Sequence, residues 1–393
     1  MKFKMVIFFS MFIISCKSPK DNLFTIDPRT FGGNAFSLSQ IAADITYCPL
    51  DNNIPFVSFK HLITPEYYYF SAKGIGILQF SREGRLIKKI GSRGRGPGEY
   101  YYGMDFAVDD KSGRVYVMDP KRIFVYSRSG IFIRNISYED YISAHSMARG
   151  IELFNSMLFI PDYLMEGNSK YNWIILDTLG NLVSKKNNTV PPFQTKVGRP
   201  GYYYLFENEL FYFNYYNDTI FSINSDFEHR GSYLFAQGNH RWPRSITTYD
   251  GNFANRVKDL FLPITMFETK RYIFIQYYYL QRAIFALIDK KSEKRYISIK
   301  DSPLPVNDEY HNFALKNDID GGMPLTSMEY YTENGIEYIT TLISPFDLKV
   351  YVSTDEFIRY EPKYPEKKQE LERLANSLKE TDNPVLVLVK LKE

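Results

Sequence analysis

Residues 67–90 of the chain read YYYFSAKGIGILQFSREGRLIKKI, and this stretch decides the fold. It holds an apolar strand, a glycine turn at Gly74, a second strand that ends in an aromatic residue, a turn at Gly84 and a third strand. Short strands that follow one another through glycine turns are typical of antiparallel sheets. The stretch therefore predicts one sheet of consecutive antiparallel strands.

The same pattern recurs along the chain, over residues 106–136, 154–183, 205–235 and 265–299. Successive turns at Gly84, Gly130, Gly180 and Asp226 are 46, 50 and 46 residues apart. All-strand repeats of this length are typical of the four-stranded blades of a β-propeller. One blade cannot cover both of its faces, whereas a closed ring covers each blade with its neighbours. We therefore predict an all-β propeller.

Both ends of the chain are expected to complete the ring. A sixth, irregular blade is expected within residues 313–343. Residues 385–389 read VLVLV, which is apolar on both faces, so this strand should be buried. Residues 45–50 also have a strand pattern. We therefore expect six blades, with the two terminal strands sharing one blade and locking the ring.

A surface helix is predicted near the C-terminus, within residues 365–380. The residues at helical spacing in this segment are Leu371, Leu374, Ala375 and Leu378. The segment 381–384, Thr-Asp-Asn-Pro, then turns the chain into the final strand.

Residues 1–16 have the pattern of an export signal. A basic start is followed by an apolar run over residues 5–14 that is too short to span a bilayer. The run ends in Ile13-Ile14-Ser15-Cys16, which resembles the lipobox of bacterial lipoproteins, where the cysteine carries the lipid. We expect a signal peptide over residues 1–15, a lipid anchor and tether over 16–40, and a single propeller domain over 41–393.

Charge and cysteine content exclude several classes of protein. The formal charge is +3, and removal of the signal peptide would leave 46 basic against 45 acidic residues. A near-neutral surface argues against a nucleic-acid partner. Only Cys48 remains besides Cys16, so no disulfide is expected within the domain. Stability must come from packing, for which 33 Tyr and 31 Phe supply side chains that favour strands.

Three phrases occur in a characteristic order: IGSRGRGPGEY at 90–100, NDIDGG at 317–322 and NPVLVL at 383–388. With them the chain resembles the six-bladed, NHL-like propeller lipoproteins of Gram-negative bacteria, a family mostly of unassigned function. The resemblance covers nearly the whole mature chain and implies the fold and export, but no catalytic residue. By resemblance to lipoprotein sorting rules, the lack of Asp after Cys16 favours the outer membrane, and the lack of an acidic export tag favours its periplasmic face.

The glycine-rich phrase at 90–100 is a candidate site. It lacks the Gly-Lys-Ser/Thr of a P-loop, and Pro97 has no backbone donor, so it is a poor nucleotide site. Its Arg93 and Arg95 are candidates to hold an anion, with a solvated basic loop as the alternative. The neighbouring Tyr100, Tyr101 and Tyr102 are candidates to stack against a sugar or a peptide, with packing between blades as the alternative.

Asp318 and Asp320 have an Asp-x-Asp spacing and are also candidate ligand-binding residues. Gly321 and Gly322 break the EF-hand pattern, and a turn or a polar loop at the mouth of the propeller is the alternative. Two tryptophans, Trp173 and Trp242, are sparse for a carbohydrate site. Metal-ligand spacing is missing among the histidines, which are His61, His145, His229, His240 and His311. We therefore predict no metal and no cofactor.

The sequence shows no catalytic constellation. It predicts a membrane-anchored, non-catalytic binding or scaffold propeller that engages a glycan, peptide or protein partner through one mouth. The alternative is a propeller-type hydrolase or lyase with a metal at the central mouth, which a tightly held calcium or zinc ion in the purified protein would favour.

The lipid anchor is directly testable. Replacing Cys16 by Ala removes the thiol that would carry the diacylglycerol, so the variant should lose labelling by radioactive fatty acid and leave the membrane fraction. The measurement is metabolic labelling followed by fractionation of the cells. Unchanged labelling of Cys16→Ala would refute the anchor.

Overall fold

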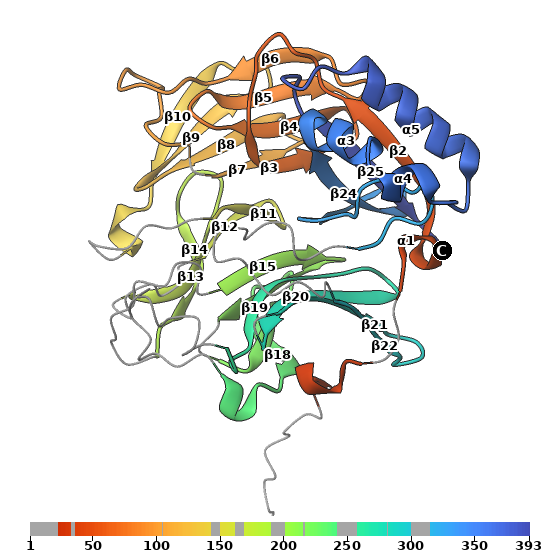
Figure 1. Cartoon of the computed structure of the whole chain (residues 1–393). Helices are drawn as coiled ribbons and strands as arrows, with labels where there is room; N and C mark the ends of the chain where they lie inside the picture. Colours follow the sequence, from red (N-terminus) through yellow and green to blue (C-terminus); the bar gives the residue numbers. More distant parts are fainter. Residues whose placement is uncertain are drawn as a thin grey trace, which may run out of the picture.

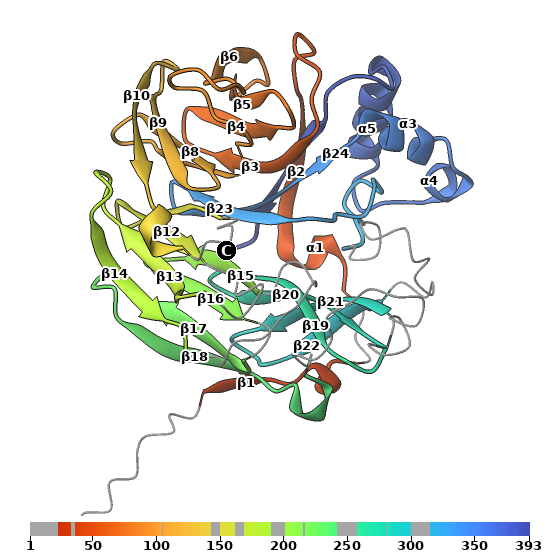
Figure 2. The same cartoon turned by 90° about the vertical axis from the view of Figure 1, so that its left-hand side faces the viewer.

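The computed structural model shows a ring of six sheets around a common axis (Figures 1 and 2). It describes residues 23–32, 36–103, 105–142, 150–161, 169–189, 201–214, 217–241, 258–280, 282–299 and 315–393. Five sheets have four strands and one has a fifth strand. The predicted six-bladed β-propeller is therefore confirmed, whereas the predicted signal peptide and Cys16 lie outside the described residues.

Blades one to five use their main strands in chain order, from the axis outwards. Blade one contains β3 (Ser58–Ile63), β4 (Tyr67–Ala72), β5 (Gly76–Ser81) and β6 (Leu86–Ile90). Blade two contains β7 (Asp105–Asp109), β8 (Arg114–Asp119), β9 (Arg122–Ser127) and β10 (Phe132–Ser137). Blade three contains β11 (Glu152–Phe154), β12 (Met157–Pro161), β13 (Tyr171–Leu176) and β14 (Leu182–Asn187). Blade four contains β15 (Gly201–Phe206), β16 (Glu209–Asn214), β17 (Thr219–Ile223) and β18 (His229–Phe235). Blade five contains β19 (Leu262–Glu268), β20 (Tyr272–Tyr279), β21 (Arg282–Asp289) and β22 (Arg295–Ile299).

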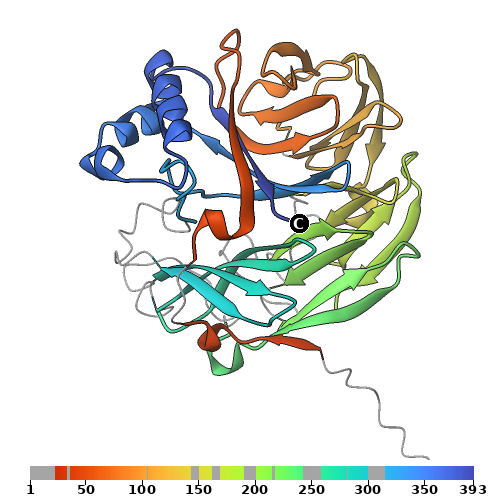
Figure 3. The same ribbon diagram turned by 90° about the vertical axis from the view of Figure 1, so that its right-hand side faces the viewer.

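The sixth blade joins the two ends of the chain, as predicted. From the axis outwards it consists of β23 (Glu329–Glu333), β24 (Ile336–Ile343), β25 (Val385–Leu391) and β2 (Ala42–Pro49). β2 pairs antiparallel with β25 over its whole length, and Figure 3 shows the red N-terminal strand beside the blue C-terminal strand. The terminal strands therefore close the ring.

β25 lies inside the protein on both of its faces. All of its residues except Lys390 are buried, which explains why this segment is apolar without alternation. Just before it, Asn383 is 3% exposed and fastens the strand to the start of blade one. Its Nδ2 donates to the carbonyls of Asp51 and Ile54, and its Oδ1 accepts from the backbone of Phe56.

Three helices lie between β24 and β25 and pack against the outside of the ring (Figure 1). They are α3 (Pro345–Val352), α4 (Asp355–Arg359) and α5 (Pro365–Ser377). α5 is the predicted surface helix, and its Leu371 and Ala375 are buried. Lys367 of α5 lies 2.6 Å from Asp44 of β2, so the helix is also tied to the closing strand.

Part of the predicted tether, residues 16–40, contacts the propeller. β1 (Phe24–Ile26) pairs in parallel with β18 as a fifth strand of blade four, and Ile26 is fully buried. The short helices η1 (Pro28–Thr30) and α1 (Leu38–Ile41) follow. Three strand residues are too few to show a period of two, which is why the sequence pattern does not reveal β1.

The core lies between the faces of neighbouring blades. One cluster joins Leu386 of blade six to Phe70 and Phe80 of blade one. In another, Trp173 of blade three meets Tyr212 of blade four edge to face, with the ring centres 6.2 Å apart. Large aromatic side chains thus bridge adjacent sheets and account for the aromatic composition.

The closing strand generates a prediction about stability. Burying a Val side chain contributes roughly 1.5–3 kcal/mol, and a buried unpaired carboxylate costs several kcal/mol more, against a typical stability of about 5–15 kcal/mol. We therefore expect Val387→Asp, or truncation before Pro384, to give insoluble or protease-sensitive protein. Soluble yield and limited proteolysis measure this.

Lys390→Asp is the matched control, because it places the same side chain at the exposed position of the same strand. This control should fold and resist protease like the parent. If Val387→Asp or the truncated chain melted like the parent, β25 would not be required for closure.

Candidate functional site

Polar residues gather around the axis of the ring at one end. They are Lys60 of β3, Asp105 of β7, Glu152 of β11, Tyr203 of β15 and Glu329 of β23. Each of these strands is the innermost of its blade. Because the blades repeat around the axis with the same strand direction, the starts of the innermost strands lie at the same end. We call these five residues the axial cluster and this end the axial face.

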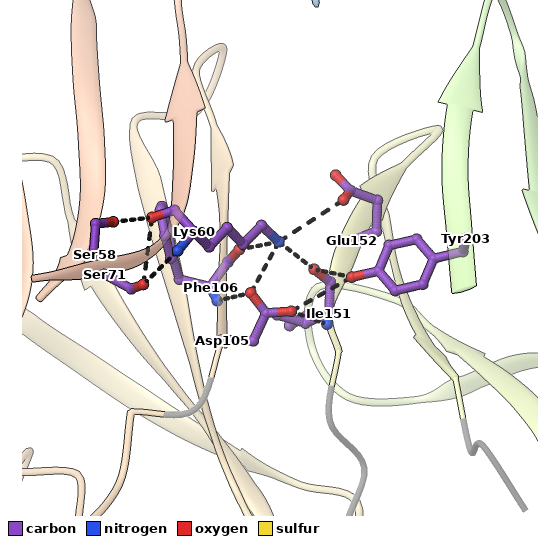
Figure 4. Close-up of polar contacts among 8 residues, drawn as sticks. All are labelled: Ser58, Lys60, Ser71, Asp105, Phe106, Ile151, Glu152 and Tyr203. Carbon is purple, nitrogen blue, oxygen red and sulfur yellow. Dashed lines mark hydrogen bonds and ion pairs between the residues drawn. The ribbon is translucent and has the colours of Figure 1, made fainter. Parts of the chain in front are cut away.

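Lys60 holds the centre of the axial cluster (Figure 4). Its Nζ donates to the carbonyls of Phe106 at 3.0 Å and Ile151 at 3.3 Å, and lies 2.9 Å from Oδ1 of Asp105. An ammonium group has three protons, so these partners use all of them. Burial opposes the charge, but the Asp105 and Glu152 carboxylates outweigh it and raise the pKa of Lys60. Lys60 therefore stays charged and links blade one to blades two and three.

A local irregularity of β3 positions Lys60. The pairing register with β4 shifts between Ser58 and His61. Ser58 Oγ donates to the Lys60 carbonyl, and Ser71 Oγ accepts from the Lys60 backbone N–H (Figure 4). The two serines satisfy the backbone groups that the regular ladder leaves unpaired, as is usual at a β-bulge.

Asp105 is the counterion of Lys60 and is itself held firmly. Its Oδ1 accepts from the backbone N–H of Phe106 at 2.7 Å, and its Oδ2 accepts from that of Ile151 at 3.0 Å. The Tyr203 hydroxyl lies 3.4 Å from Oδ2 (Figure 4). Asp105 therefore joins blades two, three and four and has little capacity left for a ligand.

The negative charges of Glu152 and Glu329 are less well compensated by nearby positive groups than that of Asp105. Glu152 lies 3.9 Å from Lys60, and Glu329 lies 3.5 Å from His61. Burial raises the pKa of Glu329 to about 8, since the attraction of Lys60 does not offset it and Asp105 adds repulsion. Burial, followed by repulsion from Asp105 and Glu329, likewise raises the pKa of Glu152 despite Lys60. The side chain of Glu329 is nevertheless 42% exposed, so solvent reaches it.

His61 does not neutralise Glu329. Its ring is buried, and its Nε2 lies 2.7 Å from Oγ1 of Thr340. Burial lowers the pKa of His61 to about 4, so the imidazole is uncharged at neutral pH. The axial cluster thus holds three carboxyl groups and one ammonium group.

This arrangement can receive a ligand that brings positive charge or hydrogen-bond donors. Carboxyl groups with raised pKa values in a partly accessible cluster are typical of functional sites. Among the residues that the structure describes, no group of three or more His, Cys, Asp or Glu side chains has the geometry to hold a metal ion.

The predicted residues Arg93, Arg95, Tyr101 and Tyr102 come together in the loop that joins β6 to β7. Both guanidinium groups lie 5.6 Å from the centre of the Tyr101 ring. Tyr101 and Tyr102 are 40% and 56% exposed and meet edge to face. Both Asp119 carboxylate oxygens accept backbone N–H groups of this loop, which fixes its shape. The loop leads directly into β7, so these side chains lie at the axial face.

Tyr100 of the same loop is buried instead. Its hydroxyl donates to the Ile90 carbonyl and accepts from the Ile77 backbone N–H. Gly91 and Gly103, both with positive φ, leave room for its ring, since a Cβ at either position would lie less than 3.0 Å from it. The structure thus places Tyr100 in the packing between strands.

Asp318 and Asp320 are engaged by protein groups. Asp318 accepts from the Ser37 hydroxyl and from the backbone and hydroxyl of Ser39. Burial opposes this charge, but these hydrogen bonds lower the pKa of Asp318. Asp320 is fully buried and accepts from Tyr47, Asn317 and Gly322. The pair therefore fastens the segment before β23 to α1 and β2, away from the axial cluster.

The other residues singled out in the sequence are scattered. His229 lies at the outer edge of blade four, His240 lies in the short helix η3 (Gly238–His240), and Trp173 is buried between blades. His145, His311 and Trp242 lie outside the described residues.

Sequence reasoning missed the axial cluster. Its members are separated by 45, 47, 51 and 126 residues, and no local motif contains two of them. One signal was available, because Asp105, Glu152 and Glu329 each begin an innermost strand. Aligning the blades at their first strands would have placed polar residues in the row that faces the axis.

Comparison with solved structures supports the fold. A Bacteroides fragilis NCTC 9343 protein described as exported matches with a TM-score of 0.63 and 14% identity, covering 94% of this chain and 99% of that one. A member of the duf4221 family from Bacteroides vulgatus ATCC 8482 matches with a TM-score of 0.50 and 13% identity, covering 89% and 97%. At such identities the likeness shows the fold alone.

No curated protein matches the chain. One family model does, and it extends from residue 23 to residue 390, which includes all six blades and the closing strand. The chain therefore belongs to the family described as domain of unknown function DUF4934.

Proposed function

We propose that this protein is a non-catalytic binding module of the bacterial cell envelope, and that its axial face engages a glycan, peptide or protein partner. One observation carries the proposal: the carboxyl groups of Glu152 and Glu329 are attracted by the ammonium group of Lys60, but that group already binds Asp105 and two backbone carbonyls. A bound donor or cation would relieve the repulsion between the carboxyl groups, which is a favourable contribution to binding.

The chemistry of the cluster favours a basic group. A guanidinium or ammonium group on the partner would pair with Glu152 and Glu329. The Tyr203 hydroxyl, 3.4 Å from Oδ2 of Asp105, lies on the same side of Asp105 as Glu152 (Figure 4). Hydrogen bonds to charged groups contribute about 1.5–3 kcal/mol each. A cationic peptide segment is therefore the ligand that fits best, ahead of a neutral glycan.

Residues of the loop before β7 are proposed to flank this site. Tyr101 and Tyr102 offer partly exposed aromatic side chains, and Arg93 and Arg95 offer guanidinium groups that no described carboxylate pairs with. Rigid aromatic side chains supply contact area at a low entropic cost. A peptide or sugar that enters the axial site could rest on this loop.

The envelope location rests on the start of the sequence, where a basic segment, an apolar run and Cys16 predict a lipid anchor on the periplasmic face of the outer membrane. The similarity to a Bacteroides protein described as exported agrees with it. No helix among the described residues is long and apolar enough to cross a membrane.

A propeller hydrolase or lyase is the second candidate. It is favoured by Glu329, because a carboxyl group with a pKa of about 8 is protonated at neutral pH and has the properties of a general acid. Esterase, lactonase and glycosidase assays decide between the two. If turnover survives repurification and is lost in Glu329→Gln, the protein is an enzyme and not a non-catalytic binding module.

The binding proposal predicts a preference for arginine over its uncharged analogue. A short peptide with two arginines should bind, and the same peptide with citrulline should bind at least about tenfold more weakly, because it cannot form an ion pair. Replacing both carboxyl groups by amides, in Glu152→Gln/Glu329→Gln, should remove this preference. Calorimetry measures each affinity.

Glu370→Gln/Glu372→Gln is the matched control, since it makes the same change in charge on the exposed side of α5. It should bind the arginine peptide like the parent. Equal affinity for the two peptides, or equal loss in both variants, would refute a cation site at the axis.

The raised pKa of Glu329 also predicts how binding depends on pH. Below about pH 8 Glu329 is protonated and must release its proton before it can pair with a cation. Affinity for the arginine peptide should therefore rise between pH 6.5 and 9 on the order of several-fold, since the guanidinium group stays charged throughout. The rise should be absent in Glu329→Gln, and a flat profile in the parent would contradict the assignment.

A further inference from the structure

A groove lies on the outer rim of the ring, between blades three and four. Its volume is about 850 Å³. β13 and β14 form one wall, with Trp173, Lys185 and Lys186, and β18 with the turn before it forms the other, with Phe227, His229 and Arg230. The groove belongs to neither the axial cluster nor the loop before β7.

The groove carries more positive than negative charge, because among its described lining residues Lys185, Lys186 and Arg230 stand against one carboxylate, Glu228. Lys185 and Lys186 have no carboxylate within ion-pair distance among the described residues, whereas Arg230 lies 2.6 Å from Glu209. The nearest polar partner of Lys186 is Nε2 of His229, at 2.6 Å. Burial and the charge of Lys186 lower the pKa of His229, so the imidazole is neutral. Its Nε2 therefore accepts a hydrogen bond from the ammonium group of Lys186. An anionic ligand would be a stronger partner for Lys186 than a neutral imidazole.

One residue of the groove has an unusual backbone. In blades one to five, the turn between the two outer strands has a left-handed residue at the same place. It is Gly84, Gly130 and Gly180 in blades one to three, and Glu293 in blade five. In blade four Phe227 takes this position with a φ of +63°. A bulky residue rarely adopts a positive φ, because its Cβ then crowds the backbone, yet here this conformation places an aromatic side chain on the groove wall.

Exposed apolar side chains continue along the rim beside the groove. They stand on the outer hairpins of blades two and three: Ile131 (68% exposed), Ile133 (44%), Leu179 (69%) and Val183 (42%). Figure 2 shows β10, β14 and β18 following one another around this side of the ring, with β1 outside β18. Exposed apolar residues next to a basic groove are typical of surfaces that contact a membrane.

The N-terminal segment reaches the propeller at this place. A Cβ at Gly231, which follows Arg230, would lie 3.2 Å from the side chain of Leu23. From Cys16 to Leu23 the chain can span at most about 25 Å when fully extended. A lipid on Cys16 would therefore keep the groove within that distance of the bilayer.

We propose that the outer rim of blades two to four is a membrane-docking surface. The groove takes the phosphate of an anionic lipid headgroup on Lys185 and Lys186, and the apolar hairpin residues enter the headgroup region. The outer hairpin turns lie at the end of the blades opposite to the starts of the innermost strands. Docking by this rim therefore leaves the axial face directed away from the bilayer and open to a partner.

The test uses protein that carries Cys16→Ala and is expressed from residue 16, so that no lipid contributes. It should sediment with vesicles of phosphatidylcholine mixed with phosphatidylglycerol and much less with phosphatidylcholine alone. Lys185→Glu/Lys186→Glu should weaken sedimentation with the anionic vesicles at least about tenfold, since each lysine near such a surface contributes about 1 kcal/mol. Unaltered thermal melting confirms that the variant folds.

Lys88→Glu/Lys89→Glu is the matched control, because it reverses two adjacent lysines on the outermost strand of blade one, far from the groove. It should keep most of the binding. Equal loss in both variants would show attraction by overall charge and overturn the proposal. Absence of binding by the parent, or equal binding to both kinds of vesicle, would overturn it as well.

The apolar residues are tested separately. Ile131→Ser/Leu179→Ser should weaken sedimentation, and the loss should persist at high salt, where electrostatic attraction is screened. Val57→Ser/Leu280→Ser removes two other apolar side chains that are more than half exposed and should have no effect. Unchanged binding of Ile131→Ser/Leu179→Ser would refute the membrane contact of the hairpins.

Discussion

The pairing of β2 with β25 is the constraint on which the rest of the structure depends. A ring of sheets buries every blade face only when the last blade meets the first. Here the last blade, blade six, is assembled from both ends of the chain. β25 is buried on both faces, and Asn383 ties its start to the segment that enters blade one. Closure of the ring therefore depends on two strands more than three hundred residues apart in the chain.

Closure brings charged residues from separate blades into one cluster. Lys60 binds groups of blades two and three, and Asp105 is held by backbone groups on both sides of it. This network stabilises the inner ends of the blades, but it uses the single ammonium group and leaves Glu152 and Glu329 poorly compensated. The ion pair that links blades one, two and three thus leaves the carboxyl groups on which the proposed binding depends.

The two proposed surfaces divide the molecule. The axial face carries carboxyl groups and an aromatic loop, and the rim of blades two to four carries lysines and apolar side chains. β1 attaches the N-terminal segment to that rim. A propeller held in this way presents its axial face to the envelope space while the outer hairpin turns at the opposite end rest on lipid. Such an orientation suits a module that binds a partner at its axial face.

The sequence by itself determined the repeat, the six blades, the C-terminal helix and the sharing of one blade by both ends, because glycine turns and apolar alternation are local signals. It also singled out Arg93, Arg95, Tyr101 and Tyr102, which the structure brings together because they lie in one loop. Only the tertiary structure decided that Tyr100 and Asp320 are buried and that Lys60, Glu152 and Glu329 meet at the axis. Contacts between blades join residues far apart in the chain, and no pattern within one blade specifies which charges its neighbours will place beside it.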